Sequence, residues 1–405
     1  MRIAIVSQSY PPLVNGQATF AGELATGMAE RDHRVLVVTP APTLHEAASQ
    51  VGNLRLHRLP GIGVRLGDAD VAITVRPTDR LARLFREFAP DVVHVQDHFP
   101  LCRAASAEAR RQDVPLVATN HFMPRNFTAY APLPGPVRSV TEEMLWATVR
   151  GVFRDARAVT TPTATAAGLL VRHGVAAAPV PISCGVDLER FRPRGQADRM
   201  RLLAAQNLPD TALLVLYVGR LDPEKRVDVL IEAMARARDP RLHLLVAGRG
   251  VARRRLVALR DRLGLSRRVQ FLGFVPDSEL PGLFDAADIF AMPSDAELQS
   301  IATLQALAVG LPVVAANAVA LPELVHPGRN GLLVAPGDPE ELARCLDALA
   351  GDPAGRAAMG REARLVAAGH DRRQMIERYE RLYVSVVAGV APKRAGRLSQ
   401  AAGRS

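Results

Sequence analysis

The chain has 405 residues, of which 48% are apolar and 23% are charged. This is the composition of a globular protein, so it excludes a disordered or collagen-like chain, and the length suffices for two or three domains. The net charge is +10, and arginine carries almost all of the positive charge because Lys225 and Lys393 are the only lysines. Such a surface favours anionic partners, such as acidic lipid headgroups, nucleotides or nucleic acid, although good solubility explains it equally well.

Cysteine usage and hydropathy narrow the class of protein further. Cys102, Cys184 and Cys345 lie far apart in the sequence, which argues against a structural zinc site and a disulfide framework and favours a reducing compartment. No apolar run reaches the roughly 18 residues that a membrane-spanning helix needs. The apolar stretch at the N-terminus is too short for a signal peptide, so we expect it to form a buried first strand.

In the first half of the chain, short apolar runs alternate with amphipathic segments. The runs predict strands at residues 2–8, 34–40, 92–97, 115–121, 158–163 and 180–185. Helices are expected between most of them, for example at 21–31 and 78–88. Several runs are β-branched throughout, which is typical of strands that are buried on both faces of a parallel sheet.

The alternation then restarts in the second half. It predicts strands at residues 212–219, 242–248, 269–275, 288–294, 312–317 and 331–336. Two successive βαβ series predict an α/β protein of two doubly wound, Rossmann-like domains. The ligand should then bind in a cleft between them, at loops that follow the carboxyl ends of the strands.

The boundaries follow from the breaks in this rhythm. We assign an N-terminal domain to residues 1–190, a polar linker to 191–210 and a C-terminal domain to 211–372. A last helix is expected at 373–390, with packing back on the N-terminal domain as one arrangement. Residues 391–405 carry basic residues and no acidic residue, so we expect a basic tail without fixed structure.

The segment VGRLDPEKRVDVLIEAM (218–234) is predicted to be a strand, a charged turn and a helix. Arg220 lies just past the strand, and Lys225 lies near the start of the helix, where free N–H groups already favour an anion. The two cations together would hold a diphosphate. The alternative is an ordinary surface salt bridge with Asp222 or Glu224.

The segment PSDAELQSIATLQALAVGLPVVAAN (293–317) has the same strand, loop and helix order. Glu297 ends the loop, so it can face the cleft and accept hydrogen bonds from sugar hydroxyls. Residues 298–301 begin the helix and offer free N–H groups. The alternative is that Glu297 merely favours the positive end of the helix macrodipole. Gln305 follows Glu297 by eight residues, about two helical turns.

Taken in order, these motifs resemble the retaining glycosyltransferases of family 4. The resemblance rests on GRLDPEK (219–225), the segment from Glu297 to Gln305 and GLPVVAAN (310–317). It also rests on residues 9–40, which begin SYPPLVNGQATF, and on LPELVHPGRNGLLVAPGD (321–338). Members have the GT-B fold, in which two Rossmann-like domains face each other. The resemblance therefore implies a metal-independent hexosyltransferase that needs no cofactor.

The resemblance also implies roles for individual residues of the C-terminal half. Arg220 and Lys225 would bind the donor diphosphate, and Glu297 would hold the sugar hydroxyls. The remaining donor-binding positions are Phe274 and Val275 at the nucleobase, Gln299, Ser300 and Ile301 at the helix start, and Gln305. The family usually has a second Glu, bound to the ribose, where this chain has Gln305. The stretch Glu297-Leu298-Gln299-Ser300 is nearest to a form found in some diacylglycerol glucosyltransferases.

Three candidates lie in the first half. Gly16 follows the first strand, where it lets the backbone approach a phosphate, although a plain turn explains it too. His121 ends a predicted strand; a lone histidine is often structural, but in the resembled family this one reaches the donor sugar. His98 also follows a strand and is our acceptor-side candidate. The aromatic residues around them would contact an apolar acceptor or pack in the core.

Other signals do not support a function. GIGVRLG (61–67) lacks the spacing of a dinucleotide-binding turn. Asp68 and Asp70 form an Asp-x-Asp pair without supporting context, so we predict no metal site. The arginine-rich segment 249–268 has apolar residues at helical spacing and no interleaved aromatic residues, so it predicts an α/β helix and no nucleic-acid partner.

We therefore predict transfer of a hexose from a UDP- or GDP-linked sugar to a hydroxyl acceptor. The basic charge favours a membrane lipid as acceptor, with the enzyme in the cytoplasm and peripheral to the inner face of the plasma membrane. A soluble small molecule is the alternative acceptor. A different class of function, an inactive nucleotide-sugar-binding subunit, stays open because of Gln305.

Overall fold

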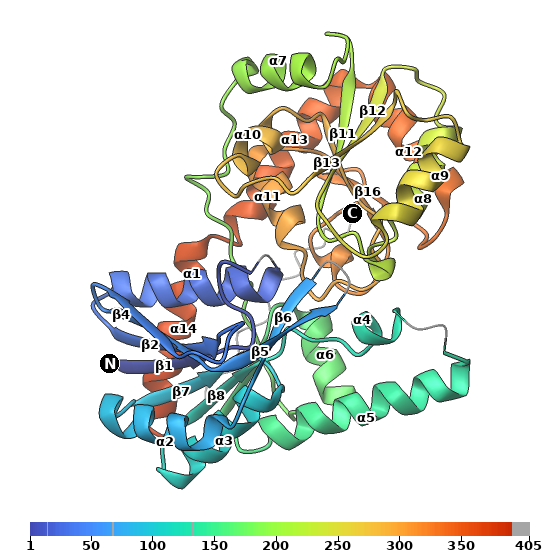
Figure 1. The fold of residues 1–405 in the computed structure, drawn as a ribbon. Helices are drawn as coiled ribbons and strands as arrows, with labels where there is room; N and C mark the ends of the chain where they lie inside the picture. The colour runs from blue at the N-terminus through green and yellow to red at the C-terminus, as the bar shows by residue number, and fades with distance from the viewer. Residues whose placement is uncertain (14, 67–68, 131–132, 391–405) are drawn as a thin grey trace, which may run out of the picture.

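The structure is a computed structural model that describes residues 1–13, 15–66, 69–130 and 133–390. Two α/β domains face each other, with the N-terminal domain below the C-terminal one in Figure 1. This confirms the predicted pair of Rossmann-like domains. The basic tail expected at 391–405 and the residue Asp68 lie outside the described part of the chain.

The N-terminal domain is built on an eight-stranded sheet with the order β10-β9-β8-β7-β1-β2-β4-β3. Its strands are β1 (Arg2–Val6), β2 (Arg34–Pro40), β3 (Ala47–Val51), β4 (Leu54–Leu59), β7 (Val92–Val95), β8 (Leu116–Thr119), β9 (Ala158–Thr161) and β10 (Val180–Pro181). All pairs are parallel except β3 with β4. A separate hairpin joins β5 (Gly61–Leu66) and β6 (Ala69–Thr74). The four strands between residues 47 and 74, β3 to β6, were not predicted from the sequence.

Helices cover both faces of this sheet. They are α1 (Gly16–Glu30), α2 (Pro77–Phe88), α3 (Pro100–Arg111), α4 (Arg125–Thr128), α5 (Gly135–Phe153) and α6 (Ala164–Arg172). Helix α1 begins five residues earlier than expected because the Asn15 side chain caps it, accepting a hydrogen bond of 2.8 Å from the Ala18 amide. No helix of the described residues combines the length and the apolar character that crossing a bilayer requires.

The C-terminal domain has a six-stranded parallel sheet with the order β13-β12-β11-β14-β15-β16. Its strands are β11 (Leu213–Val218), β12 (Leu242–Ala247), β13 (Val269–Gly273), β14 (Ile289–Met292), β15 (Val313–Ala316) and β16 (Gly331–Val334). All six were predicted. Its helical elements are α7 (Gln196–Ala205), η1 (Pro223–Lys225), α8 (Val227–Arg236), α9 (Arg253–Arg262), α10 (Leu280–Asp285), α11 (Ile301–Val309), η2 (Leu321–Glu323), α12 (Pro339–Gly351) and α13 (Pro353–Ala368).

The segment expected as a linker, 191–210, contains helix α7 and is therefore structured. Arg199 explains why, because its guanidinium lies 2.9 Å from the Asp288 carboxylate and donates to the carbonyl oxygens of Ala212 and Ala286. Leu203 is buried in the core of the C-terminal domain. The segment was predicted as a linker because it is polar, and its partners Ala286 and Asp288 lie far away in the sequence.

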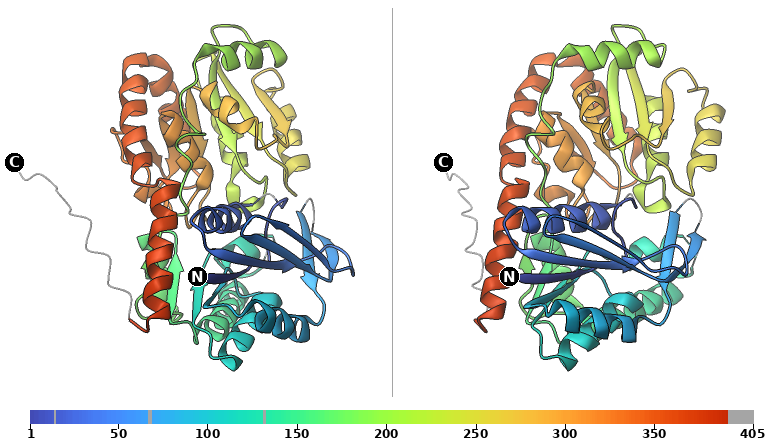
Figure 2. Two further views of the ribbon diagram at one scale, coloured as in Figure 1. Left: turned by 90° about the vertical axis from the view of Figure 1, so that its left-hand side faces the viewer. Right: turned by 60° about the vertical axis from the view of Figure 1, so that its left-hand side comes forward.

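The last helix, α14 (Arg372–Val387), returns to the N-terminal domain, as Figure 2 shows. The crossing point is fixed by two backbone hydrogen bonds, from Val186 N–H to the His370 carbonyl and from Arg372 N–H to the Val186 carbonyl. From there α14 places six buried side chains in the core of the N-terminal domain, against β1 and α1. They are Met375, Ile376, Tyr379, Leu382, Tyr383 and Val386.

A polar network in this core ties α14 to the sheet. His94 on β7 is fully buried, and its imidazole lies 2.6 Å from both the Tyr383 hydroxyl and the Thr119 hydroxyl. Tyr379 adds a contact of 3.0 Å from its hydroxyl to that of Thr160. Because buried polar groups are costly when unpaired, this network fixes one seating of α14 on the sheet.

The network predicts an acid-sensitive fold. Burial lowers the pKa of His94 from 6.5 to about 3, and the nearby His121 adds to the effect. The unfolded chain therefore binds a proton that the folded chain does not, so stability falls as the pH drops from 6.5 towards 3 and is unaffected by His94 above that window. We expect a slope of at most about 1.4 kcal/mol per pH unit from this group.

Denaturant unfolding at several pH values between 7.5 and 4.5 measures that slope. His94→Gln should be less stable at neutral pH, because it loses part of the network, but its stability should change less with pH. His45→Gln is the matched control, since His45 is exposed. An unchanged slope in His94→Gln would assign the acid sensitivity to other groups.

Candidate active site

The candidate site lies where two neighbouring strands of the C-terminal sheet end. Strands β11 and β14 are hydrogen-bonded partners, with Leu216 opposite Phe290. The turn containing Arg220 and Lys225 follows β11, and the loop containing Glu297 follows β14. Because parallel neighbours end at the same edge of the sheet, the two loops meet, and they do so on the side that faces the N-terminal domain (Figure 1).

Lys225 and Glu297 are in direct contact. The Lys225 ammonium lies 2.8 Å from the Glu297 carboxylate, and both side chains are almost buried, at 13% and 12% exposure. The Ser294 hydroxyl donates to the Glu224 backbone carbonyl over 3.1 Å, so a second hydrogen bond also joins the two loops. The structure therefore brings together two residues that are 72 positions apart in the sequence and were predicted to share one ligand.

Arg220 is held by partners in its own turn and by one in the N-terminal domain. Its guanidinium pairs with the Asp222 carboxylate and, over 2.9 Å, with the Glu224 carboxylate. It also lies 3.2 Å from the Tyr130 hydroxyl, which belongs to the N-terminal domain. Burial raises the pKa of the Glu224 carboxyl, while the charges of Lys225 and Arg220 act in the opposite direction. The salt bridges proposed as an alternative for this turn thus exist together with the contact between Lys225 and Glu297.

The loop after Glu297 is extended, and helix α11 begins only at Ile301. Ser300 is the N-cap, and its hydroxyl accepts a hydrogen bond of 3.1 Å from the Thr303 amide. The Leu298 carbonyl accepts a hydrogen bond from the Thr163 hydroxyl of the N-terminal domain over 2.9 Å. The helix was expected to begin at residue 298. The Leu298 carbonyl instead bonds the N-terminal domain, and the helix begins three residues later.

Gln299 joins the two domains. Its side-chain carbonyl oxygen accepts hydrogen bonds from the Cys184 amide over 2.7 Å and from the Ser183 hydroxyl over 3.2 Å. Its amide nitrogen Nε2 is buried and has no hydrogen-bond partner among the described residues. The Oε1 atom of this predicted donor-binding residue is therefore used in the contact with the N-terminal domain, while its Nε2 atom is available to a ligand.

The loop that begins α1 faces the start of α11. A Cβ atom added to Gly16 would lie 3.7 Å from Cδ1 of Ile301, which packs against the core of the N-terminal domain. Gly16 and Ile301, predicted from opposite halves of the chain, are thus neighbours across the domain boundary. Asn15 is occupied in capping α1.

His121 follows β8 and is positioned by the N-terminal domain. Its Nε2 lies 3.1 Å from the Gln96 side-chain oxygen, and its ring lies 4.7 Å from that of Phe20. Burial lowers the pKa of His121 to about 3, so the imidazole is neutral at physiological pH. A neutral imidazole can offer a hydrogen bond without adding a positive charge. The contacts of His121 are with Gln96 and Phe20 of its own domain, and none joins it to Lys225 or Glu297 among the described residues.

His98, predicted to lie on the acceptor side, belongs to an aromatic run of the N-terminal domain. It is buried, and its ring lies 4.7 Å from Phe99 and 4.5 Å from Phe122. Phe122 in turn lies 6.2 Å from Phe127. Phe127 and Tyr130 are about half exposed, at 52% and 45%. Core packing was one expected use of these aromatic residues, and it does not account for the last two.

The predicted nucleobase residues lie at the end of β13. Phe274 is 44% exposed and lies under the Arg249 guanidinium, 5.5 Å away, while Val275 packs against the domain core. Arg249, which contacts the predicted nucleobase residue Phe274, was not among the residues predicted from the sequence. Its signal was the pair of flanking glycines: a Cβ atom at Gly250 would lie 2.4 Å from the Leu221 carbonyl oxygen, so only glycine fits there.

Gln305 is half-buried on α11, about one turn after the helix begins at Ile301. The two helical turns expected between Glu297 and Gln305 are absent because residues 298–300 are not helical. One salt bridge between the domains was not predicted. Arg125 on α4 lies 2.8 Å from the carboxylate of Asp295, two residues before Glu297. Together with the contact from Tyr130 to Arg220, it makes the α4 segment the N-terminal element that touches both loops of the candidate site.

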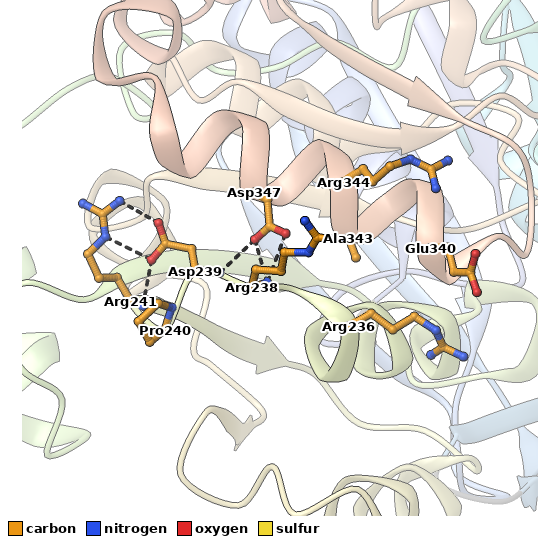
Figure 3. Close-up of a pocket in the computed structure, with 9 residues that line it drawn as sticks. All are labelled: Arg236, Arg238, Asp239, Pro240, Arg241, Glu340, Ala343, Arg344 and Asp347. Atoms are coloured by element: carbon orange, nitrogen blue, oxygen red, sulfur yellow. Dashed lines mark hydrogen bonds and ion pairs between the residues drawn. The ribbon is translucent and has the colours of Figure 1, made fainter.

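A cavity of about 850 Å³ lies elsewhere, between the end of α8 and helix α12 (Figure 3). Its arginines include Arg241, paired with Asp239 at 2.6 Å. The Asp347 carboxylate accepts hydrogen bonds from the Arg238 and Asp239 amides. Arg236 lines this cavity at the opposite end of α8 from Lys225, so the cavity is separate from the candidate site.

Comparison with known proteins agrees with this geometry. Residues 14–190 match the family described as Glycosyltransferase Family 4, and residues 198–366 match the family described as Glycosyl transferases group 1. The chain is 30% identical to a GDP-mannose-dependent alpha-mannosyltransferase of Mycobacterium tuberculosis, over 86% of this chain and 87% of that protein. It is 31% identical to D-inositol 3-phosphate glycosyltransferase 1 of Catenulispora acidiphila, over 96% of each.

A solved structure has the same fold. The HepE protein of Anabaena, in complex with UDP-glucose, superimposes with a TM-score of 0.77 at 22% identity, covering 95% of this chain and all of that one. The chain therefore has the GT-B fold and belongs to glycosyltransferase family 4. It is a glycosyltransferase that uses a nucleotide-sugar donor, and the resemblance found in the sequence is confirmed.

Proposed function

We propose that this chain is a retaining hexosyltransferase that moves a hexose from a UDP- or GDP-linked sugar to a hydroxyl acceptor. The observation that carries the proposal is the almost buried contact of Lys225 with Glu297, next to the Arg220 turn and at the carboxyl ends of adjacent strands. Two cations and one carboxylate at this edge match the two charges and the hydroxyls of a sugar diphosphate.

In the proposed reaction, Arg220 and Lys225 stabilise the negative charge that grows on the departing diphosphate. Glu297 accepts hydrogen bonds from the sugar hydroxyls once the donor has drawn Lys225 towards its phosphates. Neutral His121 hydrogen-bonds the sugar from the N-terminal side. These groups act on charge as it develops, which is the usual source of a large rate effect.

The placement of the other predicted residues supports further donor contacts as part of this proposal. Phe274 and Val275, beside Arg249, would receive the nucleobase, and Gln305 would bond a ribose hydroxyl through its carbonyl oxygen. Ser300 and Ile301 would offer backbone amides at the start of α11. Gln299 would use its unpartnered Nε2.

We assign a front-side route, in which the leaving phosphate oxygen takes the proton of the acceptor hydroxyl. Glu297 accepts a hydrogen bond from the Lys225 ammonium and is assigned to the sugar hydroxyls. We therefore give it no role as a covalent nucleophile. Closure of the two domains would exclude water and suppress hydrolysis of the donor. We propose that the reaction needs no metal ion.

The acceptor is proposed to be a membrane lipid, with the enzyme peripheral to the cytoplasmic membrane face. The half-exposed rings of Phe127 and Tyr130 at the cleft favour an acceptor with an apolar part. The relative from Catenulispora is named for a soluble phosphorylated polyol, so a soluble small molecule is the alternative acceptor.

A turnover assay tests the proposal. UDP- and GDP-linked glucose and mannose are offered with lipid and soluble acceptors, release of the nucleotide is measured, and NMR of the product gives its anomeric configuration. We expect release with at least one donor, an α-linked product and no effect of EDTA. Binding of a donor without release to any acceptor would favour the inactive-subunit alternative that Gln305 suggests, and a β-linked product would exclude retention.

A further inference from the structure

Helix α5 carries an apolar stripe on the side that faces away from the protein. Its members are exposed and follow one another at intervals of three, four, three and four residues: Val137, Val140, Met144, Ala147 and Gly151. Val137, Val140 and Met144 are 49%, 62% and 66% exposed. The buried face of the same helix is made by Trp146, Val149, Val152 and Phe153. Helix α5 is thus apolar on two opposite sides, and only one of them is covered by the part of the chain that the structure describes.

The spacing of the stripe is that of a coiled-coil seam. Alternating steps of three and four keep side chains on one line of a helix, here over about 21 Å. Figure 1 shows α5 along the lower edge of the N-terminal domain, where its outer side is open to a second helix. A Cβ atom added to Gly151 would meet nothing within 4 Å, so the smallest member of the stripe also lies in open space.

The stripe is complementary to itself when a second copy runs antiparallel. If Val140 lies opposite the partner's Gly151, then Met144 lies opposite the partner's Ala147. Two-fold symmetry repeats both pairs in reverse. Each layer then combines one large and one small side chain, which is how facing helices pack closely.

The charges beside the stripe have the same symmetry. Glu143 and Arg150 lie on one flank, 56% and 34% exposed, and form an ion pair at 2.8 Å within the chain. Arg150 also donates to the His173 carbonyl over 2.9 Å. In the antiparallel pairing Glu143 faces the partner's Arg150, so the two ion pairs join into a network of alternating charge.

We propose that α5 is a dimerisation helix, whose stripe pairs antiparallel with the same stripe of a second copy of this chain. A lipid bilayer is the competing occupant, but a helix that lies in a bilayer surface usually has lysines and arginines along its polar edge. Here the flank has one glutamate for one arginine along the helix, and Arg154 at the C-cap is paired with Asp155 at 3.6 Å, so the charges balance, which suits a symmetric partner better. A single helix pair is smaller than most stable interfaces, so we expect a dissociation constant of roughly micromolar order.

Light scattering after size-exclusion chromatography, over a range of concentrations of the full chain, tests the proposal. We expect a mass that rises from one copy to two. Met144→Glu should raise the dissociation constant by roughly a hundredfold, because it places a carboxylate in the seam without a partner. The matched control is Leu365→Glu on α13, which is 68% exposed and lies outside the stripe; it should leave the dimer intact.

A charge exchange tests the register. Glu143→Arg puts arginines at both positions 143 and 150, and Arg150→Glu puts glutamates at both, so each variant alone should be largely monomeric. Mixing the two should restore a dimer that native mass spectrometry identifies as mixed. A wild type that stays monomeric at every concentration would overturn the proposal. So would flotation of the wild type with anionic vesicles that Met144→Glu abolishes while its mass in solution is unchanged.

Discussion

Lys225→Ala should lower nucleotide release from the sugar donor by roughly a hundredfold or more. Removal of one group that stabilises developing charge typically costs about 3 kcal/mol of transition-state stabilisation. Lys225 carries a second consequence, because its ammonium is the partner of the almost buried Glu297 carboxylate. Without that cation the carboxylate loses its orientation and repels the diphosphate. We therefore expect the loss mainly in kcat, as measured by coupled detection of the released nucleotide.

Two comparisons keep this expectation specific. Arg254→Ala removes an exposed cation on α9 and should leave turnover unchanged, which controls for the general loss of positive charge. The double variant of Lys225→Ala with Glu297→Ala should cost less than the sum of the two single effects, because residues that act as a unit are not additive. Turnover of Lys225→Ala within a few-fold of wild type, with the fold intact, would remove this contact from the catalytic assignment.

The sequence predicted the strands that lie in continuous apolar runs and missed those that do not. Every continuous apolar run became a strand of a parallel sheet. Strands β3 and β4 were missed because they are more exposed: all five residues of β3 are exposed, and β4 is only partly buried. Such strands carry no long apolar run, and their position follows from pairing with β4 and within the hairpin.

The candidate site was predictable where its residues come from loops after neighbouring strands. The meeting of Lys225 with Glu297 follows from the order of β11 and β14 alone. What could not be predicted is each contact that crosses between domains. The Cys184 amide donates to the Gln299 side-chain oxygen, and Arg220 donates to the Tyr130 hydroxyl, because the two domains are held at one particular separation. No local pattern in the sequence encodes that separation.

The return of α14 to the N-terminal domain makes Tyr379 a residue on which that whole domain depends. Its side chain is fully buried among β1, α1 and the sheet, and its hydroxyl contacts those of Thr160 at 3.0 Å and Thr119 at 3.3 Å. Replacing a large buried aromatic side chain by alanine costs about 3–5 kcal/mol. We expect Tyr379→Ala to lose at least about 4 kcal/mol of unfolding free energy, measured by urea denaturation, since two buried hydroxyls also lose a partner.

Tyr379→Phe separates the two contributions, because it keeps the ring and removes only the hydroxyl; we expect it to cost about 1–2 kcal/mol. Val384→Ala on the same helix is the control, since Val384 is 54% exposed and should change the stability by less than about 0.5 kcal/mol. If Tyr379→Ala were as stable as Val384→Ala, α14 would be a loosely attached helix. The N-terminal sheet would then have to cover its own apolar face, which the fully buried Ile3 and Ile5 beneath α1 and α14 argue against.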